Sequence, residues 1–416
     1  MNNLENSNNC NRKNVNENEI YKNNQNGNEQ DENEKDENEN EQDEIESNEN
    51  EQDENEENEK ECKKNQIKEK TNSNENDIIY PIGLNNFLYE KNNGYFLGYN
   101  SYEMTTGNIC YMNSSIQCLF HLKDFTDNIT KIASHKKGDL INATSNLIEE
   151  MKNKNSDVLS VKNIKNAMGK IDERYKDNNQ EDANEFISNF LDGLLDEIGD
   201  KNNLPKPLDI KNELDRAAYD KFYNRFYKIK GNSFLLDLFY SIIKTEKKCK
   251  KCKKSNSIKF NTNNIIELPI KSLVKGKNDI YLPEVIANYK KNENITGECK
   301  FCHHGKIYEE TNIYSLPKYL ILYFGRTVGN KYISNQILFP EKCDFTNNAS
   351  YRITSVIYHS QLDKKTGHYT ASCKCDNNIW YYFNDSYAIK EKEKESIENF
   401  NNKKHLKPII LIYEKI

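Results

Sequence analysis

Two residues of this chain have the types and surroundings that covalent catalysis requires, although they lie far apart in the sequence. Cys110 stands where a turn at Gly107 passes into a segment whose apolar residues have helical spacing. The positive end of a helix lowers the pKa of a thiol placed there and favours the thiolate. His368 follows Gly367 at the start of a strand-like run, and an imidazole is the base that a cysteine nucleophile needs. The pair predicts a cysteine hydrolase.

The imidazole needs a partner that orients it, and the sequence offers two. Asn384 and Asp385 end the strand-like run that follows, so a hairpin would bring one of them to the ring. Such a partner fixes the tautomer and stabilises the imidazolium, as in Cys-His-Asn triads. His359, His303 and His304 are weaker base candidates, because none has such a partner placed in the sequence.

Two Cys-x-x-Cys pairs predict a metal site separate from this chemistry. They consist of Cys249, Cys252, Cys299 and Cys302. Four thiolates predict one tetrahedral Zn²⁺, which would be structural because no coordination position stays open for a substrate. The gap between the pairs is long, so zinc would tie together the ends of two long hairpins. Two alternatives stay open: cysteines without metal in surface loops, or a neighbouring histidine (His303 or His304) in place of one thiolate.

The composition divides the 416 residues into two parts. Residues 1–77 are mostly Asn, Glu, Asp, Lys and Gln, and they hold more than the whole formal net charge of −7. Such a segment buries too little apolar surface to offset its ordering entropy, so it is predicted to be a disordered acidic tail. Residues 78–416 are near neutral and long enough for a sizeable core with a satellite lobe.

The sequence also indicates where the protein works. Met1 is followed by polar residues, and no apolar run approaches the roughly 20 residues that a spanning helix needs. We therefore expect an intracellular protein, in cytoplasm or nucleus, that has no membrane partner. In a reducing compartment its 11 cysteines are better interpreted as metal ligands, nucleophile and core, Cys118 among the last, than as disulfides. Lysines surround Cys249 and Cys252 without interleaved aromatic residues, so nucleic acid is not an expected partner.

Helical patterns come first and strand patterns later, which favours an α+β fold. Helices are predicted at about 111–125, 140–151 and 179–198, the last capped by Asn178 or Asn179. Strands are predicted at 265–270, 319–324, 351–358, 369–372, 380–383 and 409–413.

Taken in order, these motifs resemble the ubiquitin-specific protease family from about Tyr80 to the C-terminus. Residues 107–114 resemble its cysteine box and residues 180–186 its short acidic helix motif. The cysteine pairs resemble its zinc-binding fingers. Residues 367–369 and 380–386 resemble its histidine box, and the closing apolar run resembles its last strand. Each motif alone is moderately specific, whereas all of them in this order are a strong match.

The resemblance implies a papain-like hand with a helical thumb, an antiparallel β palm and zinc-tipped fingers. The catalytic domain would span residues 78–416, with fingers at about 234–315. The implied activity is that of a thiol-dependent deubiquitinase, which hydrolyses the peptide or isopeptide bond after the C-terminal Gly of ubiquitin. The implied partners are ubiquitin and ubiquitinated proteins.

The resemblance also implies a role for each site residue. Cys110 would attack the carbonyl, while His368 would take the thiol proton and later protonate the leaving amine. Asn384 matches the third triad residue and Asp385 the acidic residue beside it. Asp182 would lie along the channel for ubiquitin's extended tail.

One departure from the family pattern concerns the oxyanion hole. The family usually has Asn five residues before the nucleophile, and here that position is Thr105. The family's Gly-Leu-x-Asn occurs earlier and ends at Asn86, so our hypothesis is that Asn86 fills the position and the intervening residues loop out. Two rivals therefore stay open: a ubiquitin-binding scaffold of the same fold with impaired catalysis, and a thiol protease for a ubiquitin-like modifier or an ordinary peptide.

Overall fold

The structure is a computed structural model, and all its described residues lie in the unit that runs from Ser73 to Ile416. The predicted tail, residues 1–77, lies outside them. The described ranges are 82–84, 87–91, 102–106, 108–153, 158–275, 277–290, 293–329, 331–346, 349–361, 367–375, 378–391, 401 and 406–416, with the backbone alone for 87–91, 102–106, 331, 346 and 361.

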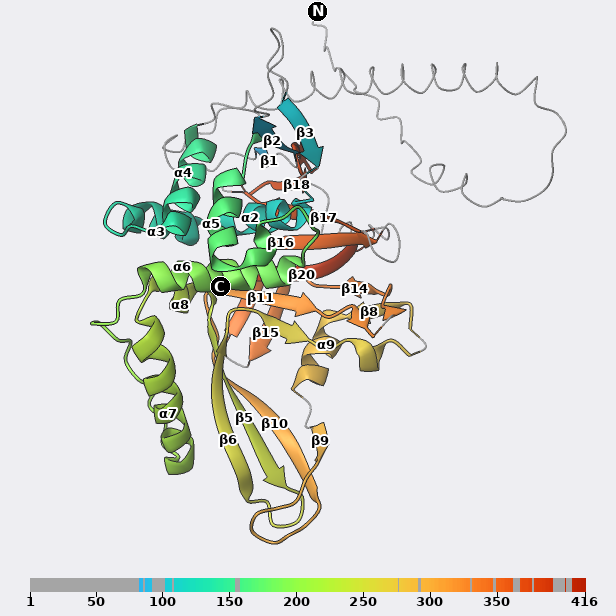
Figure 1. Cartoon of the computed structure of the whole chain (residues 1–416). Helices are drawn as coiled ribbons and strands as arrows, with labels where there is room; N and C mark the ends of the chain where they lie inside the picture. Colours follow the sequence, from blue (N-terminus) through green and yellow to red (C-terminus); the bar gives the residue numbers. More distant parts are fainter. Residues whose placement is uncertain are drawn as a thin grey trace, which may run out of the picture. The chain divides into compact units, whose positions relative to one another are not determined.

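Helices dominate the first half of this unit, and all but the one at Glu213–Lys230, which lies beside the second sheet, make up the thumb (Figure 1). They are α2 (Cys110–Phe120), α3 (Lys123–Ala133), α4 (Asp139–Asn153), α5 (Lys162–Ile171), η2 (Glu173–Tyr175), α6 (Ala183–Ile198), α7 (Glu213–Lys230) and α8 (Phe234–Phe239). Among the described residues, no helix combines the length and the apolar character that crossing a membrane requires.

The palm is an eight-stranded sheet in the order β19-β18-β17-β16-β20-β11-β7, with β15 also pairing with β16. All pairs are antiparallel except β11 with β7. The strands are β7 (Ile266–Leu268), β11 (Tyr319–Phe324), β15 (Lys342–Thr346), β16 (Ala349–Gln361), β17 (Gly367–Lys374), β18 (Trp380–Asn384), β19 (Tyr387–Lys390) and β20 (Lys407–Lys415).

A second, four-stranded antiparallel sheet extends away from the palm as the fingers (Figure 1). Its order is β6-β5-β10-β9, built from β5 (Ser241–Cys249), β6 (Ser255–Asn263), β9 (Glu293–Thr296) and β10 (Lys306–Ser315). Smaller elements complete the fold: β1 (Gly83–Leu84) with β4 (Val158–Leu159), β2 (Phe87–Lys91) with β3 (Tyr102–Thr106), β8 (Asp279–Tyr281) with β14 (Gln336–Leu338), β12 (Thr327–Val328) with β13 (Lys331–Tyr332), η3 (Lys271–Leu273) and α9 (Leu282–Tyr289).

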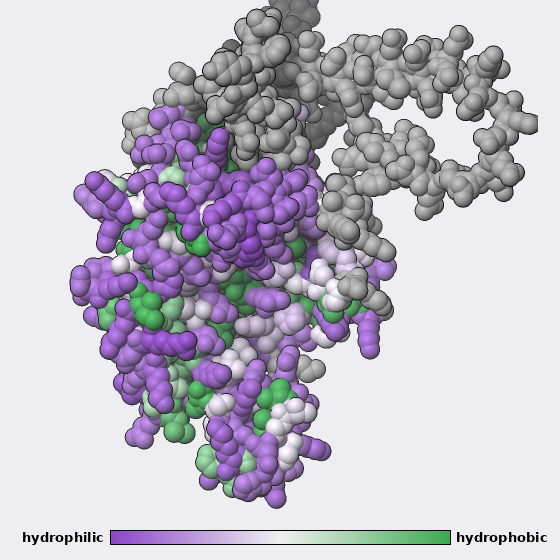
Figure 2. All heavy atoms as spheres, viewed as in Figure 1, coloured by the Kyte–Doolittle hydropathy of each residue, from purple (hydrophilic) through white to green (hydrophobic). Residues whose placement is uncertain are grey.

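The palm sheet separates two hydrophobic clusters, because successive side chains of a strand point to opposite faces. On β20, Ile410 and Ile412 join the cluster that holds α2 and α6, whereas Leu411 and Tyr413 join the cluster on the other face. Every residue of α2 is buried. The helix that begins with Cys110 is therefore fixed on all sides by the core. Figure 2 shows a predominantly hydrophilic surface on the viewed face, with small hydrophobic areas between.

The structure confirms the predicted α+β class but corrects two helix boundaries. The predicted helix 111–125 is two helices, because Leu122 has an extended backbone (φ −97°, ψ 102°) and caps α3. The predicted helix 179–198 begins only at Ala183, with Asp182 as its N-cap in place of Asn178 or Asn179. The residues before Asp182 form other hydrogen bonds, described below.

Candidate active site and metal centre

Cys110 is the first residue of α2, and the residue is 3% exposed. The preceding residue, Ile109, supplies no side-chain cap, and the first turn holds no acidic residue. The N–H groups of Met112 and Asn113 donate to the carbonyl of Ile109, and the first turn places no carboxylate of its own beside the sulfur. Asn108 has φ 46°, which turns the chain sharply into the helix. The predicted position of Cys110 at a helix start is confirmed.

His368 lies at the start of β17, and its ring points to the end of β18. His368 Nε2 lies 2.6 Å from Asn384 Oδ1 and 4.0 Å from Asp385 Oδ2. An amide oxygen only accepts, so Nε2 carries the proton in this hydrogen bond and Nδ1 is left for the thiol. The hairpin of β17 and β18 thus brings together the residues that the sequence analysis placed at its two ends.

Charge at the site favours a protonated imidazole. A hydrogen bond with Cys110 raises the pKa of His368 to about 9, against the opposing effect of burial. The hydrogen bond to Asn384 and the charge of Asp385 act in the same direction as Cys110. This arrangement can hold a thiolate beside an imidazolium, which is the reactive form of a cysteine nucleophile.

Asp385 is held by contacts that the sequence analysis did not find. Asn113 Nδ2 donates to Asp385 Oδ1 at 2.8 Å and to the carbonyl of Leu84 at 3.2 Å. The backbone N–H of Leu84 in turn donates to the carbonyl of Asp385 at 2.7 Å. Asn113 follows Cys110 by three residues, which places both on one face of α2. This three-residue spacing from Cys110 is the sequence feature that could have indicated Asn113 as a site residue.

The structure describes the two oxyanion candidates to different extents. Asn86 lies outside the described residues, but Leu84, two residues before it, is fastened to Asp385 and Asn113. Thr105 belongs to β3, of which the backbone alone is described. β3 pairs with β2 so that Phe87 lies opposite Thr106. The two ends of the segment 87–106 therefore lie side by side.

Asp182 caps α6 and contacts Tyr323 of the palm strand β11. One carboxylate oxygen accepts the backbone N–H of Asn184 at 2.8 Å, and the other accepts the hydroxyl of Tyr323 at 3.4 Å. Burial raises the pKa of Asp182, against the effect of these bonds. The carboxylate therefore lies partly out of water, where a further hydrogen bond from a ligand would be strong.

The alternative histidines have other surroundings. His359 packs on the Tyr369 ring with centroids 4.5 Å apart, and burial, with smaller effects of Arg326 and His368, lowers the pKa of His359 to about 4. His303 Nδ1 lies 2.6 Å from Glu298 Oε1 at the fingertip. Among the described residues, these contacts give neither ring a place beside Cys110.

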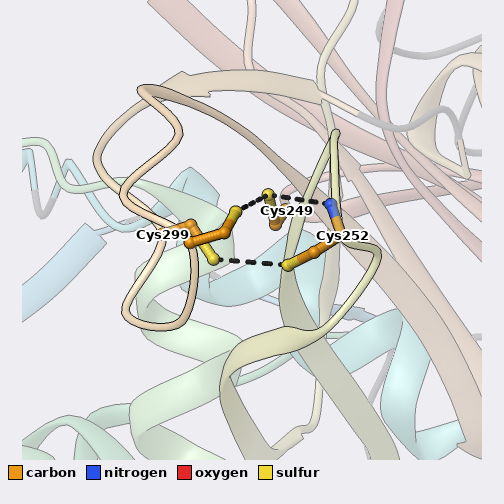
Figure 3. A group of neighbouring side chains, drawn as sticks. Cys249, Cys252 and Cys299 are labelled. Atoms are coloured by element: carbon orange, nitrogen blue, oxygen red, sulfur yellow. Dashed lines mark hydrogen bonds between the residues drawn. The ribbon is translucent and has the colours of Figure 1, made fainter.

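The four predicted metal ligands come together at the ends of two finger hairpins. Their sulfur atoms all lie within 4.8 Å of one another. Cys249 Sγ lies 3.6 Å from Cys302 Sγ, and Cys252 Sγ lies 3.5 Å from Cys299 Sγ. Zn–S bonds of about 2.3 Å in a tetrahedron place sulfurs about 3.8 Å apart, close to these separations. Figure 3 shows the three labelled sulfurs facing one another across the gap between the loops.

The two cysteine loops have the same local geometry. Lys253 and His303, each the residue after its pair, have φ of 61° and 55°. Backbone N–H groups point at the first sulfur of each pair: Lys251 N and Cys252 N at Cys249 Sγ, and Phe301 N at Cys299 Sγ, at 3.3–3.4 Å. Such N–H groups stabilise thiolates. The site fits a tetrahedral ion bound by four thiolates.

A helical thumb, a sheet palm and cysteine-tipped fingers accompany a cysteine and a histidine that are suited to thiol hydrolysis. The model of the family described as "Ubiquitin carboxyl-terminal hydrolase" matches residues 103–413. The chain therefore belongs to this family, and within it to the ubiquitin-specific proteases, as the sequence motifs predicted.

Curated relatives support the assignment. The chain is 27% identical over 298 residues to ubiquitin carboxyl-terminal hydrolase Usp2 of Drosophila melanogaster, covering 67% of this chain and 32% of the relative. It is 25% identical over 309 residues to ubiquitin carboxyl-terminal hydrolase 2 of Homo sapiens, covering 67% of this chain and 50% of the relative. The chain thus spans a third to a half of the length of these relatives.

Solved structures show the same fold. Structures of the SAGA DUB module, one from yeast and one bound to monoubiquitin, superpose with TM-scores of 0.60 at 18% sequence identity. They cover 84% of this chain and 72% of the chain compared. The likeness confirms the hand-shaped α+β fold expected from the sequence.

Proposed function

We propose that this chain is a thiol-dependent deubiquitinase that hydrolyses the bond after the C-terminal Gly of ubiquitin. One observation supports it above the others: His368 Nε2 is hydrogen-bonded to Asn384, Asp385 lies 4.0 Å away, and the interaction with Cys110 is the main cause that raises the pKa of His368. Family membership and the monoubiquitin bound to a structure of the same fold point to ubiquitin as the partner. Ubiquitinated proteins are then the substrates.

The chemistry follows from the geometry. Cys110 Sγ, its proton passed to His368, attacks the carbonyl carbon of ubiquitin's last Gly. The tetrahedral intermediate collapses to a thioester as His368 returns that proton to the leaving amine. Water, deprotonated by His368, then hydrolyses the thioester and restores the thiol. Asn384 keeps the ring oriented through Nε2, and Asp182 binds the extended tail that leads to the cleaved bond.

The proposal is tested by turnover of ubiquitin carrying a C-terminal fluorophore, compared with a ubiquitin-like modifier and a plain peptide. Cleavage of the ubiquitin substrate alone supports it. Cleavage of another substrate in its place would reassign the enzyme to a different modifier. Ubiquitin binding without turnover of any of the three would identify a scaffold.

The protonated His368 predicts a descending limb in the pH profile of kcat/KM near pH 9, because the leaving amine needs the imidazolium proton. Asp385→Asn removes a negative charge that raises the pKa of His368. In the variant, the descending limb of the kcat/KM profile should therefore lie at a pH about one unit lower than in the native protein. An unchanged limb in Asp385→Asn would show that this charge does not act on the histidine.

The four cysteines are proposed to hold one structural Zn²⁺, which would join the two finger hairpins. Metal analysis should find about one zinc per chain. Cys299→Ser should lower zinc affinity by more than the 10–100-fold that loss of an outer-shell partner costs, and should lower the unfolding temperature as well. Cys343→Ser, a buried cysteine outside the cluster, serves as the control. Equal zinc in both variants would disprove the ligand assignment.

Three further predictions of the sequence remain proposals. The first is the division into a tail (1–77) and a catalytic domain (78–416) with fingers at about 234–315. The second is an intracellular location, in cytoplasm or nucleus. The third is that nucleic acid is no partner.

A further inference from the structure

The residues that precede α6 form hydrogen bonds both with Asn108, just before α2, and with Gly367, the first residue of β17. We call the segment 177–182 the catalytic bracket. Asn108, two residues before Cys110, donates from Nδ2 to the carbonyl of Asn178 at 2.9 Å. Two residues further along the bracket, Gln180 contacts the strand that carries His368. A single short segment thus touches the chain next to the nucleophile and the chain next to the base.

Gln180 binds Gly367 through both ends of its side-chain amide. Gln180 Nε2 donates to the carbonyl of Gly367 at 3.1 Å, and the N–H of Gly367 donates to Gln180 Oε1 at 3.3 Å. The pairing of β17 with β18 begins only at Ala371. The Gln180 amide therefore takes the place of a neighbouring strand at the edge of β17 that β18 does not reach, one residue before His368.

Gly367 is confined on a second side by His359. A Cβ on Gly367 would lie 2.0 Å from His359 Nε2, so any larger residue there would have to displace the His359 ring. The His359 ring is itself half-buried and packs on Tyr369. The backbone that enters His368 is held between the His359 ring and the amide of Gln180, which restricts its movement.

The bracket is anchored at both of its ends. Lys165, 5% exposed, donates from Nζ to the carbonyl of Tyr175 at 2.8 Å and to that of Asp177. At the other end Asp182 caps α6. A buried ammonium with such carbonyl partners is costly to displace. The bracket therefore transmits the position of the thumb helices to the start of β17.

We propose that Gln180 is a positioning residue that sets where His368 lies relative to Cys110. This inference rests on the proposed function for its effect on turnover, but not for its effect on the Cys110–His368 pair. Gln180 is exposed, so it is held against Gly367 by its two hydrogen bonds and not by burial. A displacement of about 1 Å at a reacting group costs about 10²-fold in rate.

The test uses the full chain with Gln180→Ala and Gln180→Met, the second keeping the side-chain volume without either hydrogen bond. Asn179→Ala is the matched control, because Asn179 is exposed in the same bracket but bonds only to Asp177 among the described side-chain contacts. Two quantities are measured: kcat and KM on ubiquitin with a C-terminal fluorophore, and the pH dependence of Cys110 alkylation by iodoacetamide, resolved by mass spectrometry. Thermal unfolding verifies that each variant is folded.

Both Gln180 variants should lower kcat by about 10–10²-fold with little change in KM, and should displace the alkylation profile. Asn179→Ala should match the native protein in both. Native kcat and a native alkylation profile in the Gln180 variants would overturn the proposal, and so would a lowered kcat with an unchanged profile. A displaced profile in a protein that does not cleave ubiquitin would uphold the positioning role and refute the proposed function.

Discussion

Replacing Cys110 with alanine is expected to lower kcat on a ubiquitin substrate by about 10⁶-fold, the loss typical when a catalytic nucleophile is removed. Cys110 is the cysteine whose hydrogen bond raises the pKa of His368. Its absence removes the atom that attacks and the charge that keeps the imidazole protonated. The measurement is steady-state hydrolysis of ubiquitin with a C-terminal fluorophore.

Two further variants make this result specific. His368→Ala should cost about as much as Cys110→Ala, and the double variant should cost little more, because the two residues act as one unit. Cys118→Ala is the matched control, since Cys118 lies on the same helix but its sulfur faces Cys373 at 3.7 Å. If Cys118→Ala abolished turnover in a folded protein and Cys110→Ala did not, the assigned nucleophile would be wrong.

The second large effect concerns the oxyanion hole. Asn86→Ala is expected to lower kcat by about 10²–10³-fold, as removal of one oxyanion donor typically does. Leu84 is hydrogen-bonded to Asp385 and Asn113 of the catalytic site, and Asn86 follows Leu84 by two residues in the sequence. The β2–β3 pairing supports a loop-out of the residues between Asn86 and the nucleophile.

Thr105→Ala separates the two candidates for this role. If Asn86 is the donor, Thr105→Ala should leave kcat close to the native value. A large loss in Thr105→Ala with native turnover in Asn86→Ala would instead assign the role to the threonine hydroxyl. Native turnover in both variants would refute the hypothesis that a side chain at either position stabilises the oxyanion.

The parts of the site that the sequence predicted are those set by local patterns. Helical spacing after Cys110 predicted a thiol at a helix start. Alternating strands predicted the hairpin that places Asn384 beside His368, because a hairpin joins residues that are near in sequence. The two Cys-x-x-Cys pairs predicted the four-cysteine cluster, since in a reducing compartment such pairs are typical of metal sites.

The parts that the sequence analysis missed depend on contacts between distant segments. Gln180 and Gly367 are 187 residues apart, and Asn113 and Asp385 are 272 apart. Bonds from a side chain to another segment leave no periodic trace in a sequence. The start of α6 was misplaced for the same reason, because the polar residues before Asp182 serve the catalytic bracket rather than the helix cap.

The central claim is that Cys110 is a competent thiolate in a site that recognises ubiquitin. It is tested most directly by labelling the protein with ubiquitin that has a thiol-reactive group at its C-terminus, with Cys110→Ala alongside. We predict a covalent adduct with the native protein and none with Cys110→Ala. No adduct with the native protein, folded and with its zinc bound, would contradict the role of Cys110.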